Sequence, residues 1–143
     1  MIKIGIIREG KTPPDSRVPL NPSQCKSIID RGIDLVVQPS PIRCFSDADY
    51  ISSGVTLQED LSDRDVLLGV KEVPKSHLIP NKTYFFFSHM IKEQPYNRDL
   101  LKHIISHKIK LIDYEVLTDG NGARVIAFGK FAGMVGAHNG LWT

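Results

Sequence analysis

The motifs that this 143-residue chain lacks exclude several classes of function. No strand-like run leads into G-x-G-x-x-G, and G-x-x-x-x-G-K-[ST] is absent, so the chain shows no nucleotide-binding loop of its own. No apolar run approaches the roughly 20 residues that cross a bilayer. The N-terminal residues MIKIGIIREG do not have the pattern of a secretory signal. We therefore expect no membrane partner and a cytoplasmic location.

The chain also has few cysteines and a small net charge. The two cysteines, Cys25 and Cys44, have neither metal-binding nor redox-motif spacing, which predicts free thiols and no metal site. The 18 basic and 16 acidic residues give a formal net charge of +2, and no basic run with interleaved aromatic residues occurs. These features argue against a nucleic-acid partner.

The chain does contain enough apolar sequence for one folded domain. Hydrophobic residues make up 41% of it, and a domain of this length can bury most of the surface that its unfolded chain exposes. There is no internal repeat and no low-complexity linker. We therefore expect a single domain over residues 1–143.

Strand-like and helix-like segments alternate along this domain. The expected strands are 2–7, 35–38, 65–70, 83–87, 110–114 and 124–128, and the expected helices are 22–31, 47–54 and 95–107. The third helix has Leu100, Leu101, Ile104 and Ile105 at helical spacing, which predicts one apolar face. The alternation indicates an α/β fold with a mostly parallel sheet.

The last segment, GKFAGMVGAHNGLWT, has an unusual distribution of glycine. Gly129, Gly133, Gly136 and Gly140 are spaced as on one side of a helix. Such a side suits close packing against another element. Because no capping signal follows at residues 141–143, we expect a helix that is cut short and a chain that is a fragment of a longer protein.

Polar residues follow the expected strands where these end. Lys71 follows DVLLGV, His89 follows TYFFF, and Arg17 lies in the loop after the first strand. Open parallel sheets bind ligands beyond the carboxyl ends of their strands. Arginine binds carboxylates in a bidentate manner, while histidine and a lysine held against apolar walls can exchange protons near neutral pH. The three residues would together suit a keto acid or an amino acid.

Each of these residues also has a simpler interpretation. A histidine at a strand end can be structural or solvated, Lys71 can be a surface lysine, and Arg17 can pair with Asp15 and do nothing else. A domain that only binds other proteins would not bring Arg17, Lys71 and His89 together. Composition and spacing leave these alternatives open.

Four blocks of the sequence, in order, resemble a known family. IGIIREGKTPPDSRVPLNP, LLGVKEVP, KTYFFFSHMIKEQ and LIDYEVLTDGNGARVIAFGKFAG are similar to the N-terminal domain of the alanine dehydrogenase and transhydrogenase superfamily. The VVQPS and FSH-x-I-K blocks resemble its lysine-pathway branch, which comprises lysine-forming saccharopine dehydrogenase and the lysine–ketoglutarate reductase region of aminoadipic semialdehyde synthase. The similarity covers almost the whole chain.

The resemblance implies a Rossmann-like, flavodoxin-like layered fold and a set of site residues. Arg17 in R-x-P-L would contact a substrate carboxylate, and Lys92 would provide a further carboxylate contact. Lys71 in V-K-E-x-P and His89 in F-F-S-H would act as the acid–base groups.

The reaction that the resemblance implies is the reductive condensation of lysine with 2-oxoglutarate to saccharopine. The cofactor would be NAD or NADP, bound mainly by a dinucleotide-binding domain of the same parent chain that this sequence lacks. The 143 residues alone would therefore be inactive, and the family also allows a homo-oligomer. Two alternatives are an alanine dehydrogenase with the same residue scheme and a free-standing, non-catalytic module that binds an amino acid or a keto acid.

Overall fold

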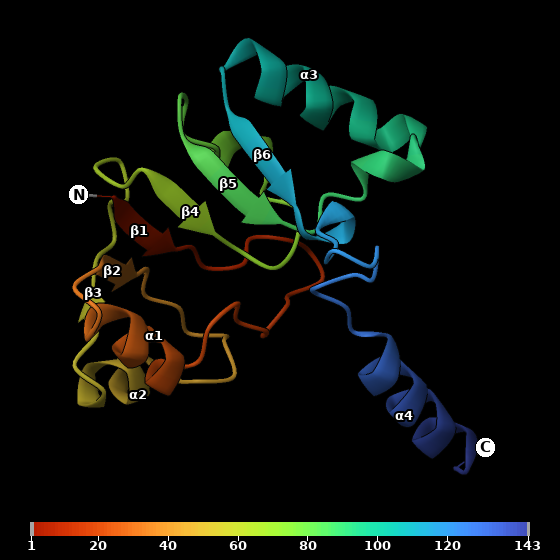
Figure 1. The fold of residues 1–143 in the computed structure, drawn as a ribbon, viewed down its shortest axis with the longest axis horizontal. Helices are drawn as coiled ribbons and strands as arrows, with labels where there is room; N and C mark the ends of the chain where they lie inside the picture. Colours follow the sequence, from red (N-terminus) through yellow and green to blue (C-terminus); the bar gives the residue numbers. More distant parts are fainter. Residues whose placement is uncertain (1, 143) are drawn as a thin grey trace.

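Six parallel strands form one sheet in the computed structural model, which describes residues 2–142 (Figure 1). The strands are β1 (Lys3–Ile6), β2 (Asp34–Val37), β3 (Thr56–Leu57), β4 (Val66–Leu68), β5 (Thr83–Phe86) and β6 (Lys110–Asp113). Their order is β3-β2-β1-β4-β5-β6, and every neighbouring pair is parallel. This is the strand order of a doubly wound, Rossmann-like sheet. The predicted α/β fold class is confirmed.

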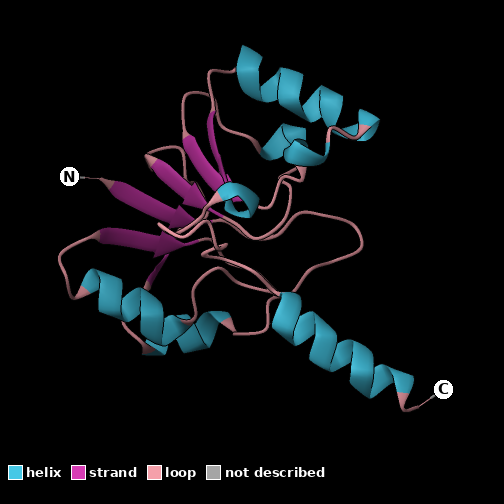
Figure 2. Cartoon of the chain, turned by 45° about the vertical axis from the view of Figure 1, so that its right-hand side comes forward, coloured by secondary structure: helices cyan, strands magenta, loops and turns pink. Residues whose placement is uncertain are grey.

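Helices lie on both faces of this sheet (Figure 2). The α-helices are α1 (Pro22–Ile29), α2 (Asp47–Ser52), α3 (Arg98–Ser106) and α4 (Gly129–Gly140), and the short 3-10 helices are η1 (Lys75–His77), η2 (Met90–Lys92), η3 (Pro95–Asn97) and η4 (Tyr114–Val116). Helices α1 and α2 lie beside β1–β3, α3 lies on the other side beside β5 and β6, and α4 extends away from the sheet (Figure 1).

Helix α1 begins where the sequence predicts it. The Asn21 side chain accepts a hydrogen bond from the backbone N–H of Gln24, and the Gln24 side chain accepts one from the N–H of Asn21. With Pro22 in the first turn, this reciprocal cap uses donors that the start of a helix would otherwise leave without partners.

The core has two layers because side chains of a strand alternate between the faces of the sheet. In β2, Leu35 and Val37 pack on the side of α1 and α2, where Cys25 and Tyr50 are fully buried. Val36 points to the opposite layer, which contains residues of β4, β5 and α3. Cys25 is buried and Cys44 is exposed, and both thiols are free, as predicted.

The apolar face predicted for α3 is narrower in the structure. Ile104 is 4% exposed and packs in the core with Leu100, whereas Leu101 is 44% exposed and Ile105 is 67% exposed. Residues four apart share one side of a helix, but residues one apart are rotated by about 100°. The helix therefore buries Leu100 and Ile104 and leaves the neighbouring pair at the surface.

The strand predicted at 124–128 is wrong. Residues 118–124 form a tight turn with a single antiparallel bridge between Thr118 and Arg124. Asp119 N–H donates to the carbonyl of Ala123 at 2.8 Å, and the Val125 N–H donates to Leu117 at 2.9 Å. The bridge cannot extend into a ladder because the preceding residues 114–116 form the 3-10 helix η4 instead of an extended partner.

Three glycines on one side of α4 pack against no other element within the described part of the chain. A Cβ atom added at Gly129, Gly133 or Gly136 would have no atom within 4 Å. The close packing predicted for these glycines therefore does not occur within residues 2–142. No helix in this range has the length and apolar character needed to span a membrane.

Candidate functional site

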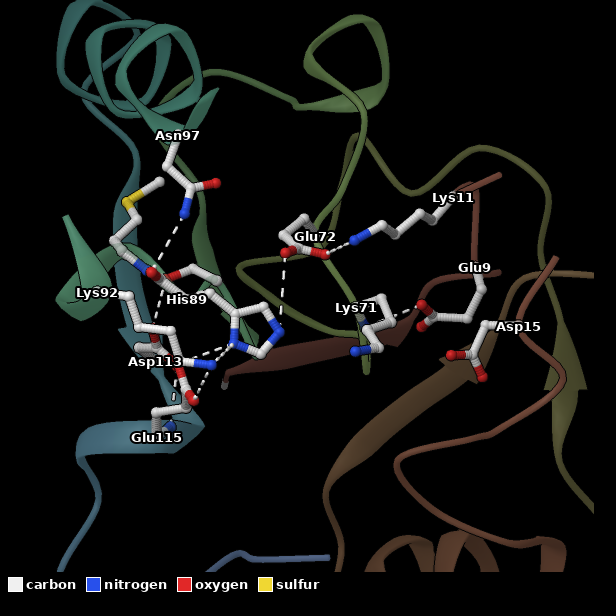
Figure 3. A network of polar contacts seen from close by, with 12 residues as sticks. Glu9, Lys11, Asp15, Lys71, Glu72, His89, Lys92, Asn97, Asp113 and Glu115 are labelled. Atoms are coloured by element: carbon white, nitrogen blue, oxygen red, sulfur yellow. Dashed lines mark hydrogen bonds and ion pairs between the residues drawn. The ribbon is translucent and has the colours of Figure 1, made fainter. Parts of the chain in front are cut away.

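The candidate site lies at the carboxyl ends of β1, β4, β5 and β6 (Figure 3). The strand order runs outward in both directions from β1 and β4, so the loops that follow these two strands flank the point where the topology reverses. Crevices at such points are the usual ligand sites of open α/β sheets. Most of the polar residues described below come from one of these loops or from the segments after β5 and β6, while Asp113 ends β6 and Asn97 precedes α3.

Glu9 joins the loop after β1 to the loop after β4. Its carboxylate accepts hydrogen bonds from the backbone N–H groups of Val70 at 2.7 Å and Lys71 at 2.9 Å. Burial raises the pKa of Glu9, and the two N–H donors oppose this shift. The contact fixes the backbone from which the Lys71 side chain extends.

Arg17 forms an ion pair with Asp15 in the same loop. Its Nε donates to Asp15 Oδ1 at 3.0 Å, and its Nη2 donates to Asp15 Oδ2 at 2.6 Å. The hydrogen bonds from Arg17 lower the pKa of Asp15, and the charge of Lys71 lowers it further. Within residues 2–142, the side-chain hydrogen bonds of Arg17 come from Nε and Nη2, and Nη1 has no hydrogen-bond partner. One edge of the guanidinium is therefore available to a ligand.

His89 follows β5 and is held in an uncommon conformation. Its φ of +56° lies in the left-handed region that side chains with a Cβ seldom adopt. The Asn97 side chain donates to the His89 carbonyl at 3.1 Å, which helps to hold this geometry. Nδ1 of the ring lies 3.0 Å from Glu115 Oε2, and Nε2 lies 3.8 Å from Glu72 Oε1. The imidazole therefore has a carboxylate beside each nitrogen.

Basic and acidic side chains alternate along a row that includes His89 (Figure 3). Lys11 Nζ lies 2.6 Å from Glu72 Oε2, and Lys92 Nζ lies 3.6 Å from Glu115 Oε1 and 3.4 Å from His89 Nδ1. The row thus reads Lys11, Glu72, His89, Glu115, Lys92. Oε1 of Glu72 is buried and has no hydrogen-bond partner among the described residues. A donor from a ligand or from a protonated imidazole would satisfy it.

Ser88 and Asp113 link the segments that carry His89 and Glu115. The buried Ser88 hydroxyl donates a hydrogen bond to Asp113, whose other carboxylate oxygen accepts one from the Glu115 N–H at 2.9 Å. The Met90 N–H donates to the Ser88 hydroxyl at 3.2 Å. These contacts connect the ends of β5 and β6 and set the positions of His89 and Glu115.

A pocket of about 410 Å³ opens beside the Lys11–Glu72 pair. It is lined by Gly10, Lys11, Thr12, Glu72, Val73, Pro74, Lys75, Tyr96, Asn97, Asp99 and Leu100. Its volume is within the range of about 300–1,000 Å³ that is common for small-molecule sites. The row of charged side chains therefore adjoins enough space for a metabolite.

The predicted site residues all lie at this edge of the sheet. His89 and Lys92 are in direct contact, Lys71 precedes Glu72, and the charge of Lys71 acts on Asp15, the partner of Arg17. Glu9 and Lys11 were not predicted, although the E-G-K sequence directly after the first expected strand could have indicated them. The catalytic and substrate-binding roles of Arg17, Lys71, His89 and Lys92 stay predictions.

The loop after β1 does not fit a dinucleotide. In Rossmann-like nucleotide sites, a short glycine-rich turn leads from β1 into the first helix and leaves the N–H groups of that helix open. Here a long loop intervenes, and the N–H of Gln24 in the first turn of α1 is already bound by Asn21. Within residues 2–142, no group of three or more His, Cys, Asp or Glu side chains could hold a metal ion.

The fold and the site together define a class: a parallel α/β domain with ionisable side chains at its strand ends. The model of the family described as "Alanine dehydrogenase/PNT, N-terminal domain" matches residues 5–135. The chain therefore belongs to this family, and the family resemblance of its sequence blocks is confirmed.

Two relatives come from the lysine-pathway branch. The mitochondrial alpha-aminoadipic semialdehyde synthase of Bos taurus is 46% identical over 125 residues, which cover 87% of this chain and 14% of the bovine protein. The NAD(+), L-lysine-forming saccharopine dehydrogenase of Yarrowia lipolytica is 34% identical over 148 residues, which cover 99% of this chain and 40% of the yeast protein. The chain thus spans less than half the length of either relative.

Solved structures confirm the fold. An L-alanine dehydrogenase superposes with a TM-score of 0.72 at 22% identity, covering 85% of this chain and 35% of that protein. The transhydrogenase of Sinorhizobium meliloti superposes with a TM-score of 0.66 at 17% identity, covering 80% of this chain and 36% of that protein. At these identities, the similarity establishes the architecture and leaves the substrate open.

Proposed function

We propose that this chain is the substrate-binding and acid–base domain of a nicotinamide-dependent saccharopine dehydrogenase or lysine–ketoglutarate reductase. The observation that carries the proposal is the position of His89 between Glu72 and Glu115, at the sheet edge that also holds Lys71 (Figure 3). Arg17 lies in the loop after β1, where it binds Asp15, on which the charge of Lys71 also acts. The names of the bovine and yeast relatives support the choice of lysine and 2-oxoglutarate as substrates.

The reaction requires several proton transfers. The ε-amine of lysine attacks the keto carbon of 2-oxoglutarate, the resulting carbinolamine loses water, and hydride reduces the imine. The attacking amine must lose a proton, and the departing hydroxyl must gain one. We assign these transfers to Nζ of Lys71 and the ring of His89. The carboxylates of Glu72 and Glu115 hold that ring in one orientation, as a general acid–base catalyst requires.

Basic side chains on both sides of the acid–base pair suit a substrate with several carboxylates. The free Nη1 of Arg17 would bind one carboxylate of the keto acid, and the guanidinium edge held by Asp15 sets its direction. Lys92, held near Glu115, would bind a further carboxylate. Binding at two points fixes the keto carbon relative to the attacking amine, which lowers the entropic part of the barrier.

The nicotinamide cofactor, NAD or NADP, belongs in this proposal to a dinucleotide-binding domain of the same parent chain. The lack of a fitting dinucleotide loop after β1 supports that assignment. The isolated 143 residues would then bind substrate without turning it over. The bovine relative is named as mitochondrial, so the cytoplasmic location stays a prediction, as does a homo-oligomeric state.

The test of the substrate uses the complete reading frame in an assay that follows reduced nicotinamide by its absorbance. One reaction contains lysine and 2-oxoglutarate, another contains pyruvate and ammonium, and each is run with NADH and with NADPH. Oxidation only with lysine and 2-oxoglutarate supports the proposal and identifies the cofactor. Oxidation only with pyruvate assigns the protein to alanine dehydrogenase chemistry. No oxidation in any reaction favours a non-catalytic binding module.

The test of the acid–base pair uses Lys71→Met and His89→Gln in the same enzyme. We expect Lys71→Met to lower kcat by at least 100-fold, the lower end of what general acid–base groups contribute. His89→Gln should remove one limb of the pH–rate profile. Lys102→Met and His138→Gln, at exposed helical positions, are the matched controls and should leave rate and profile unchanged. An unaltered profile in His89→Gln would show that this residue transfers no proton.

A further inference from the structure

A row of aromatic rings joins the strand ends of the site to Arg17. The rings of Tyr114, after β6, and Phe87, after β5, have centroids 5.1 Å apart, and the rings of Phe87 and Phe128 have centroids 5.5 Å apart. The guanidinium carbon of Arg17 lies 5.2 Å from the centroid of the Phe128 ring. The row therefore runs from the segments that carry Glu115 and His89 to the loop after β1.

The inner part of this row is fixed, and its outer end is accessible. Phe87 and Tyr114 are each 7% exposed and form a core cluster with Val70, whereas Phe128 is 42% exposed. Phe128 directly precedes α4, and its carbonyl accepts the hydrogen bond from Ala132 that closes the first turn of this helix. One face of the Phe128 ring is thus available to Arg17, at the point where α4 joins the domain.

Arg17 is restrained in two directions. Asp15 binds the Nε and Nη2 edge of the guanidinium, and the guanidinium carbon lies over the Phe128 ring. A carboxylate alone allows a long side chain to tilt about the ion pair, and an aromatic ring that attracts the cation opposes tilting away from it. The two contacts together leave Nη1 as the edge with no hydrogen-bond partner among the described residues.

We propose that Phe128 is a positioning residue for Arg17, which directs Nη1 toward the carboxylate of the keto-acid substrate and couples that direction to the start of α4. The inference rests on the proposed function, because Arg17 must bind the substrate for its orientation to matter. Phe128 itself touches neither the acid–base pair nor the reacting atoms in this proposal. Its replacement should therefore change substrate affinity and leave the chemical step intact.

The test measures kcat and KM for 2-oxoglutarate and for lysine in the complete enzyme. Phe128→Leu keeps an apolar side chain of similar size but removes the aromatic face. From the strength of cation–π contacts at exposed sites, we expect KM for 2-oxoglutarate to rise about 2- to 5-fold while kcat changes less than about 2-fold. Phe128→Tyr keeps the ring face and should retain the original KM. Phe131→Leu, on the exposed first turn of α4, is the matched control and should have no effect.

Arg17→Ala, measured beside these variants, separates this inference from the proposed function. If Arg17→Ala raises KM for 2-oxoglutarate and Phe128→Leu does not, the positioning role is refuted and the proposed function is retained. If neither variant changes KM, both the carboxylate contact and the positioning role are wrong. In the Arg17→Ala background, Phe128→Leu should have no additional effect on KM. Additive effects in the double variant would overturn the inference even if Phe128→Leu lowers stability.

Discussion

Asp113 connects the two strand ends that hold His89 and Glu115, so its removal tests the architecture of the site. Its carboxylate accepts one hydrogen bond from the fully buried Ser88 hydroxyl and another from the backbone N–H of Glu115. Asp113→Ala removes both acceptors in a part of the protein where water does not readily replace them, because Asp113 is 8% exposed. We expect a large loss of folding stability.

The magnitude follows from the two lost contacts. A hydrogen bond to a charged group contributes about 1.5–3 kcal/mol, so the two together should contribute about 3–6 kcal/mol. For a domain of this size the total stability is about 5–15 kcal/mol, so the loss is a substantial fraction. As a control, Asp30→Ala removes an exposed pair with Lys26, four residues apart in sequence, which should contribute only about 0.3–0.5 kcal/mol.

Urea unfolding followed by far-ultraviolet circular dichroism measures both losses. With an m value of about 2 kcal/mol per molar, Asp113→Ala should lower the midpoint by about 1.5–3 M. Asp30→Ala should lower it by no more than about 0.25 M. If Asp113→Ala unfolds within about 0.5 M of the unmodified chain, the two hydrogen bonds do not hold the strand ends together, and our account of how His89 is positioned fails.

Two further predictions concern ionisable groups outside the acid–base pair. Cys25 is fully buried, and burial raises the pKa of its thiol to about 11. Iodoacetamide at pH 8 should therefore modify only the exposed Cys44 in the folded chain and both thiols in urea. Mass spectrometry of the two cysteine peptides measures this, and modification of Cys25 in the folded state would contradict the prediction. Burial raises the pKa of Glu9 above its ordinary 4.5, so the folded state retains the proton longer than the unfolded state, and stability should fall as the pH rises from 4.5 through the raised value. Glu9→Gln should remove this decline, and identical pH dependences of Tm in both proteins would exclude it.

Local features of the sequence predicted the elements well where a short range of residues determines them. The cap formed by Asn21 and Gln24, with Pro22 between them, predicts the start of α1 because all its contacts lie within one turn. Lys71 and His89 could be assigned to strand ends because the apolar runs before them are continuous. The two-residue strand β3 was missed because so short a segment has no periodicity of its own.

Other features depend on which segments become neighbours. The sequence contains apolar residues at both 100/104 and 101/105 in α3, and only the position of the sheet decides that the first pair is buried. The segment 124–128 has β-forming residues, yet the preceding residues turn into η4 and provide no strand to pair with. In both cases the apolar residues are present, but no neighbouring element covers the pair 101/105 or pairs with the segment 124–128.

For the candidate site too, some features follow from the sequence and others depend on the tertiary structure. The sequence by itself determined the α/β class and the family, and it indicated that Lys71 and His89 follow strands and that Arg17 lies in the loop after the first strand, because these follow from local patterns and motifs. Only the tertiary structure brings Glu72 and Glu115 to opposite sides of one imidazole and Glu9 to the backbone of Lys71. These contacts join segments up to 62 residues apart, and they exist because parallel pairing places the carboxyl ends of β1, β4, β5 and β6 at a single edge.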